Sequence, residues 1–181
     1  MAITRLGGAN AISGTIPQSN IANASLGAVT ALPAGVGGKV LQVQFTQGIS
    51  QFASTSSSFV DVTGLSLTIT PAATSSKILL LCNTNTHQST SQEYFAMRWE
   101  RAISGGATTG LGNGTYGNSF ARSAIANDFW GGVGMTYLDS PSTTSEITYQ
   151  VQASNAGSGS SFTIGVNSSD TNNIYALEIA G

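Results

Sequence analysis

Hydrophobic and polar residues alternate along most of the chain after residue 38, which is the period of a β-strand with one face against a core. The alternation is clearest over 40–46, 65–70 and 146–153. The run 77–85 instead begins with consecutive aliphatic residues, as in a strand buried on both faces. Turn-forming residues separate these runs. Further short strands are predicted over 59–62, 94–103, 119–126, 129–138, 162–166 and 174–179.

These segments amount to about ten strands without a helix between them. Short strands at regular spacing, separated by turn signals, indicate an all-β sandwich or barrel. Alternation along so many strands also implies that each sheet has one face in the core and one face in water or against a partner. We therefore predict one antiparallel β domain over residues 39–181.

The first 38 residues have a different pattern. An aliphatic residue recurs every few positions, but the spacing fits neither a helix nor a strand, and glycines and Pro17 interrupt it. Such a segment cannot form a core of its own, so we predict an extended arm that buries its side chains against a partner. A flexible tail is the alternative. The residues expected to dock are Ile3, Arg5, Leu6, Ile12, Ile16, Ile21 and Leu26.

Charge is scarce in this 181-residue chain, since only 8% of the residues are charged, against roughly 25% in an average soluble protein. Six basic residues are too few for a surface that follows a phosphate backbone, so no nucleic-acid partner is expected. No apolar run approaches the ~20 residues that span a bilayer, and the N-terminus lacks the pattern of a signal peptide. Weakly charged β faces favour association, which predicts a stable homo-oligomer.

Candidate chemistry is sparse. His87 is the only histidine and Cys82 the only cysteine. A zinc site therefore lacks enough ligands, and a Ser-His-Asp triad would have to use His87 as its base. We interpret His87 as a surface-loop residue and Cys82 as a buried thiol. The eight acidic residues are not paired by any motif of a polysaccharide-cleaving enzyme. We expect no enzymatic activity, no cofactor and no metal.

Five segments of the chain carry a family resemblance. They are MAITRLGGANAISGTIP at 1–17, GGKVLQV at 37–43, ITPAATSSKIL at 69–79, LDSPSTTSEITY at 138–149 and LEIA at 177–180. In this order they resemble virion structural proteins of marine tailed bacteriophages, and the resemblance covers nearly the whole chain. It implies a C1q/TNF-like antiparallel jelly-roll sandwich of about ten strands after an extended N-terminal arm, usually as a homotrimer. Such proteins serve as tail fibres, receptor-binding tips or head decorations.

The same resemblance implies a protein of the virion, made in the host cytoplasm, whose arm docks on the capsid or on a tail adaptor. Its domain would be a knob, with host attachment through a surface glycan as one use. A lectin-like carbohydrate-binding module at a tail-fibre tip is the alternative, and the position on head or tail stays open. The trimer interface is predicted at Phe45, Trp130, Tyr175 and Leu177, and a receptor contact at Trp99, Tyr116 and Phe120.

Overall fold

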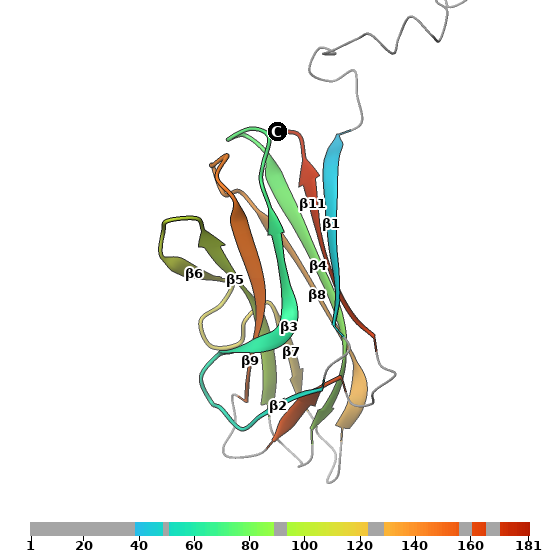
Figure 1. The fold of residues 1–181 in the computed structure, drawn as a ribbon. Coiled ribbons are helices and arrows are strands. Elements are labelled where there is room, and N and C mark those ends of the chain that lie inside the picture. The colour runs from blue at the N-terminus through green and yellow to red at the C-terminus, as the bar shows by residue number, and fades with distance from the viewer. Residues whose placement is uncertain (1–38, 49–50, 89–93, 123–128, 156–160, 166–170) are drawn as a thin grey trace, which may run out of the picture. The chain divides into compact units, whose positions relative to one another are not determined.

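The computed structural model describes residues 39–48, 51–88, 94–122, 129–155, 161–165 and 171–181, of which residues 94, 119–122 and 129 are described by their backbone alone. The described residues form strands and turns (Figure 1). None of them belongs to a helix that is long and apolar enough to cross a membrane. The predicted docking residues of the arm, from Ile3 to Leu26, lie outside the described residues.

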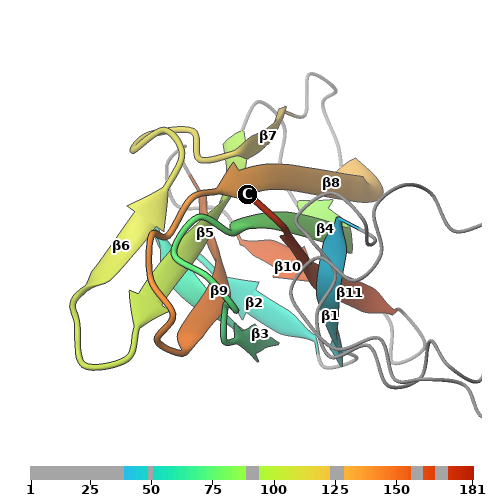
Figure 2. The ribbon, with the colours of Figure 1, turned by 90° about the horizontal axis from the view of Figure 1, so that it is seen from above.

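Eleven strands of the described residues form two antiparallel sheets. The six-stranded sheet consists of β1 (Val40–Gly48), β2 (Phe52–Ser54), β4 (Lys77–Gln88), β8 (Phe129–Asp139), β10 (Phe162–Ile164) and β11 (Asn172–Ile179). The five-stranded sheet consists of β3 (Val60–Ile69), β5 (Tyr94–Ile103), β6 (Thr108–Leu111), β7 (Ser119–Arg122) and β9 (Ile147–Asn155). Figure 2 shows β8, β4, β11 and β1 on one side of the domain and β6, β5, β9 and β3 on the other.

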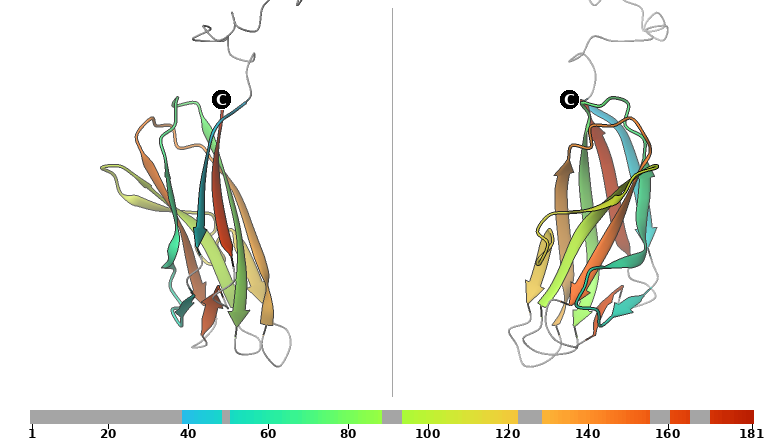
Figure 3. Two further views of the ribbon diagram at one scale, coloured as in Figure 1. Left: turned by 45° about the vertical axis from the view of Figure 1, so that its right-hand side comes forward. Right: turned by 90° about the vertical axis from the view of Figure 1, so that its left-hand side faces the viewer.

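The strands pair in a nested order. β1 pairs with β11, β3 with β9, β4 with β8, and β5 with both β6 and β7. Strands from the two ends of the domain therefore lie side by side, and pairs closer to the middle of the sequence lie inside them, as Figure 3 also shows. This arrangement in two packed sheets is a jelly roll, which confirms the predicted fold class.

The core lies between the two sheets and follows the alternation of the strands. In β5, Phe95, Met97 and Trp99 point into it, and in β9 Ile147, Tyr149 and Val151 do so. Trp99 and Tyr149 have no exposed surface and are the largest fully buried side chains of the described residues. Burial of such side chains contributes roughly 1.5–3 kcal/mol each, so this layer holds the sheets together.

Three details differ from the sequence prediction. The two strands predicted at 59–62 and 65–70 are one strand, β3, with a register shift between Asp61 and Ser66. Gly64 lies in this irregular stretch with a φ of 85°, which glycine adopts without strain. The short strands β2 and β6 are not among the predicted strands. His87 is not in a loop, because β4 continues to Gln88.

Candidate interaction surface

The outer face of the six-stranded sheet is apolar at the end where the domain begins. Strand register places Val43 beside Leu177, Leu177 beside Leu79, and Leu79 beside Leu138. One row of aliphatic side chains therefore crosses β1, β11, β4 and β8. We call this surface the apolar face, and it consists of Val43, Phe45, Leu79, Leu81, Leu138, Tyr175 and Leu177.

Three of these hydrophobic side chains are open to solvent, and the other four are half-buried. Val43 is 54% exposed, Phe45 51% and Leu138 51%. The second row contains an aromatic pair, in which the rings of Phe45 and Tyr175 have centroids 4.9 Å apart. A contiguous patch of exposed apolar side chains on a water-facing sheet is typical of an interaction surface.

The apolar face follows from the sequence of its strands. In β11, Ile174 and Ala176 are buried in the core, while Tyr175 and Leu177 point to the other side and are half-buried. In β4 the consecutive leucines 79–81 likewise supply both faces. Such strands have two apolar faces, and a two-sheet sandwich covers only one of them. The second face therefore lacks a cover within the described residues.

The other half of the same sheet face is polar and hollowed. Asn83 and Asn85 of β4 lie beside Gly134 and Gly132 of β8, and these residues help to line a hollow of about 310 Å³. A Cβ on residue 132 would meet no atom closer than 3.9 Å, so packing does not require glycine there. The apolar face thus ends after two rows.

Trp130 lies on this face at the far end of β8, beyond the hollow. It is 58% exposed, and its ring centroid lies 4.1 Å from that of His87. Of the residues predicted for the trimer interface, Phe45, Tyr175 and Leu177 are therefore neighbours in the apolar face, whereas Trp130 is separate from them. His87 supports the indole from the neighbouring strand.

The outer face of the five-stranded sheet has the opposite character. Across β3, β9 and β5 its side chains are hydroxyls, amides and charged groups, with Ser66 beside Gln150 and Gln150 beside Glu100. The neighbouring row on the same outer face contains Asp61, Gln152 and Arg98. The scarcity of charge in the whole chain does not explain why one outer face is apolar and the other polar. The apolar face is therefore a distinct feature of the six-stranded sheet.

The predicted receptor residues are not gathered in one place. Trp99 has no exposed surface, which contradicts its predicted role as a receptor contact, because its strand points it between the sheets with Phe95 and Met97. Tyr116 is 50% exposed in the connection between β6 and β7. Phe120 lies in β7, and its side chain is outside the described residues.

A buried polar network that the sequence analysis missed joins the two sheets. Asp139 of β8 accepts hydrogen bonds from Nη1 of Arg101, at 2.8 and 3.0 Å, and from the Tyr149 hydroxyl at 2.6 Å. Burial of the hydroxyl, and then its hydrogen bond to the Asp139 carboxylate, raise the pKa of Tyr149 far above its usual value. The phenol is therefore a fixed donor, and the network is structural.

A second buried acid fixes the end of β11. Burial opposes ionisation of Glu178, but the nearby Ser76 hydroxyl and the hydrogen bonds from Gln42 and the backbone N–H of Ala72 outweigh it and leave the pKa below its usual value. The Gln42 amide donates at 2.6 Å and the Ala72 N–H at 2.7 Å. Glu178 therefore ties β11 to β1 directly behind the apolar face.

The acidic side chains, His87 and Cys82 form no metal-binding cluster in the described part of the chain. Three or more His, Cys, Asp or Glu side chains do not come together there in a group that could hold a metal ion. Burial raises the pKa of the Cys82 thiol to about 12, so this cysteine is a core residue, as expected. The apolar face is therefore the feature that a function must explain.

Comparison with known proteins adds weak structural likenesses. No protein-family profile matches the chain, and no curated protein sequence matches it. Among solved structures, the infectious bursal disease virus Gx strain structure matches with a TM-score of 0.45 and 12% identity over 78% of this chain. The VP2 subviral particle of infectious bursal disease virus matches with a TM-score of 0.44 and 16% identity over 78% of this chain. This chain spans about a third of those chains, 33% and 34%.

Proposed function

We propose that the protein is a non-enzymatic structural component of a bacteriophage particle, and that copies of it associate through the apolar face as a homotrimer. The observation that carries the proposal is the row Val43, Leu177, Leu79 and Leu138, which crosses four strands in register. The nested strand order and the resemblance of the sequence to phage virion proteins support the same assignment. Self-association would cover side chains that a monomer leaves in water.

The free energy available from this face suits an association of several copies. Full burial of a Val, Leu or Phe side chain is worth about 1.5–3 kcal/mol, and the seven residues of the apolar face are partly or largely uncovered in one chain. Association costs on the order of 4–15 kcal/mol for lost freedom of motion. A ring in which every copy contacts two neighbours gains this burial at each contact and leaves no apolar face open.

The geometry of the sheet favours a ring around β11. Tyr175 and Leu177 lie on β11, with Val43 and Phe45 of β1 on one side and Leu79 and Leu81 of β4 on the other. If β11 lies near a threefold axis, β1 meets one neighbour and β4 with β8 meets the other. Each of the predicted residues Phe45, Tyr175 and Leu177 would then be in an interface.

A charge introduced into the apolar face tests the trimer. Val43 is exposed, so Val43→Glu should fold as a monomer while it blocks contact with a neighbour. Thr68→Glu is the matched control, because it places the same charge at an exposed strand position on the five-stranded sheet. Light scattering should give about three times 18.4 kDa for the wild type and Thr68→Glu, and a single chain for Val43→Glu. A wild-type protein that is a monomer at micromolar concentration would overturn the proposal.

In the proposed particle, residues 1–38 attach the trimer to a capsid protein or a tail adaptor. Three arms from one trimer would bind together, which raises the overall affinity well above that of one arm. A protein lacking residues 1–30 should therefore remain a trimer and no longer join particles assembled in its presence. Wild-type incorporation of the truncated trimer would show that the arm is not the anchor. Immunolabelling of intact particles would place the protein on head or tail.

A further inference from the structure

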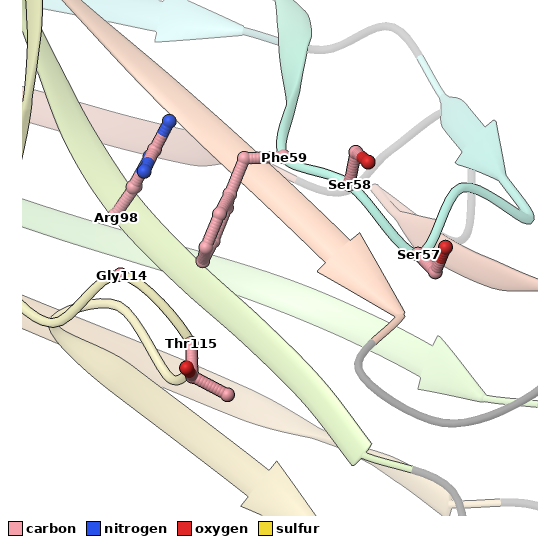
Figure 4. Close-up of a pocket in the computed structure, with 6 residues that line it drawn as sticks. All are labelled: Ser57, Ser58, Phe59, Arg98, Gly114 and Thr115. Carbon is pink, nitrogen blue, oxygen red and sulfur yellow. The ribbon is translucent and has the colours of Figure 1, made fainter.

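A second hollow lies on the outer face of the five-stranded sheet, on the side away from the apolar face. It has a volume of about 470 Å³, within the range of small-molecule sites. The connection between β2 and β3 forms one wall and the connection between β6 and β7 forms the other (Figure 4). The residues that line it are Ser57, Ser58, Phe59, Arg98, Gly114 and Thr115.

Arg98 is held in place at this hollow by three neighbours. Its Nε donates a 2.8 Å hydrogen bond to the Gln152 side chain, and its guanidinium lies over the Phe59 ring, 4.2 Å from the centroid. Gly110 provides the space, because a Cβ there would lie 2.7 Å from Cζ and Nη1 of Arg98. A fixed guanidinium loses little entropy when it binds a ligand.

The terminal nitrogens of Arg98 have no hydrogen-bond partner among the described residues. Among the described residues, the guanidinium makes no ion pair with a carboxylate, and Nε is its hydrogen-bonding atom. Two acids on the same sheet face, Asp61 and Glu100, instead accept hydrogen bonds from the Gln152 amide, at 2.8 Å and 3.0 Å. The N–H groups of a guanidinium can donate two parallel hydrogen bonds, which match the two oxygens of a carboxylate.

The walls around Arg98 carry hydroxyls on ordered turns. The Ser56 hydroxyl accepts from the Ser58 N–H at 3.1 Å and donates to the Ser58 carbonyl at 2.8 Å. On the other wall, the Asn113 side chain accepts from the Thr115 N–H at 2.8 Å. In Figure 4 the Phe59 ring stands between Arg98 and the two serines. The hollow therefore combines one aromatic ring, a forked cation and several hydroxyls.

We propose that this hollow binds a saccharide that carries a carboxylate, such as a uronic acid residue of a surface polysaccharide. The carboxylate pairs with the terminal nitrogens of Arg98. Because the guanidinium covers one face of Phe59, the sugar ring lies along the edge of that aromatic ring, and its hydroxyl groups meet Ser57, Ser58 and Thr115. The site is separate from the proposed trimer interface, since it lies on the other sheet. Its binding can therefore fail while the trimer forms, and the reverse also holds.

The test is calorimetric titration of the full-length protein with oligogalacturonate and sialyl-lactose. The carboxyl-reduced oligomer and lactose serve as their neutral partners, and a sulfated oligosaccharide tests whether another anion suffices. We expect saturable binding of a carboxylated sugar at least roughly tenfold tighter than of its neutral partner. Equal affinity for the two members of a pair, binding of the sulfated sugar alone, or no binding would overturn the proposal.

Variants then locate the site. Arg98→Gln should weaken binding of the carboxylated sugar by roughly tenfold or more, and Phe59→Leu should weaken binding of both members of a pair. Lys39→Gln is the matched control, because it removes the same charge from an exposed position outside the hollow and should bind as the wild type does. If Arg98→Gln does not fold, Arg98→Lys keeps the cation without its fork and should weaken the preference for the carboxylated sugar. An unchanged preference in the folded variant would overturn the site.

Discussion

Tyr149→Phe should lower the free energy of unfolding by about 1.5–2 kcal/mol, within the ~1.5–3 kcal/mol of a hydrogen bond to a charged group. The substitution removes one hydroxyl, which donates to Asp139 at 2.6 Å. Tyr149 has no exposed surface, and phenylalanine fills the same space without a cavity. Asp139 also keeps the hydrogen bonds from Arg101, so we expect the lower half of the range.

The same network predicts a larger loss for Asp139→Asn. This change leaves the Arg101 guanidinium, whose side chain is 19% exposed, without its carboxylate partner. Removal of one member of a buried ion pair costs about 3–5 kcal/mol, and the partial exposure of Arg101 moves the expectation to about 3 kcal/mol or below. Because Tyr149→Phe and Asp139→Asn remove a shared contact, their losses should not add in the double variant.

Urea unfolding at one fixed protein concentration measures these differences, because the stability of an oligomer depends on concentration. The fluorescence of the buried Trp99 reports the transition. Tyr137→Phe is the control, since its hydroxyl makes no hydrogen bond within the described residues, and it should change the free energy of unfolding by less than about 0.5 kcal/mol. A loss for Tyr149→Phe that is no larger than that of Tyr137→Phe would refute the role of the network.

Three further predictions follow from single buried groups. The pKa of Glu178 is lowered in the folded state from its usual 4.5, so its contribution to stability is present above pH 4.5 and is lost as the pH falls through the folded-state pKa. The urea midpoint of Glu178→Gln should therefore fall less with acid than that of the wild type. An equal dependence of the two midpoints on pH would contradict this. Cys82 should resist a thiol reagent at pH 8 until urea unfolds the protein, and fast labelling of native protein would show that it is accessible. Trp99→Ala should cost about 3–5 kcal/mol in unfolding experiments, whereas a stable variant with altered receptor binding would restore the surface role.

The strands and the core could be predicted because both depend on a local period of two residues. Residues 94–103 show why the inward face was also accessible from the sequence. Arg98 and Glu100 alternate with Met97 and Trp99, so charge on one set of positions marks the other set as the core. The same alternation places Trp99 on the inward set, with Phe95 and Met97, so the predicted receptor contact at Trp99 conflicts with the pattern of its own strand.

The candidate sites depend on register and could not be predicted in the same way. Phe59 and Arg98 are 39 positions apart in the sequence, and only the packing of the connection before β3 across the outer face of β9 and β5 brings their side chains within 4.2 Å. Asp139 and Arg101 likewise come from different sheets. The alternation of each strand shows which side a residue faces, but it does not show which residue of another strand lies opposite.

The position of the apolar face along the sheet bears on how copies would attach to a particle. Its two rows lie at the end of the sheet where Val40 pairs with Ile179, which is the end at which the domain begins. Below them the face is lined by Asn83, Asn85 and glycines, which gain little from contact with another copy. In the proposed trimer the three copies of residue 39 would therefore lie near one another, so that the three arms begin close together. In that proposal, an arm that had bound would hold the other two at high local concentration, and a weak individual contact would suffice for stable attachment.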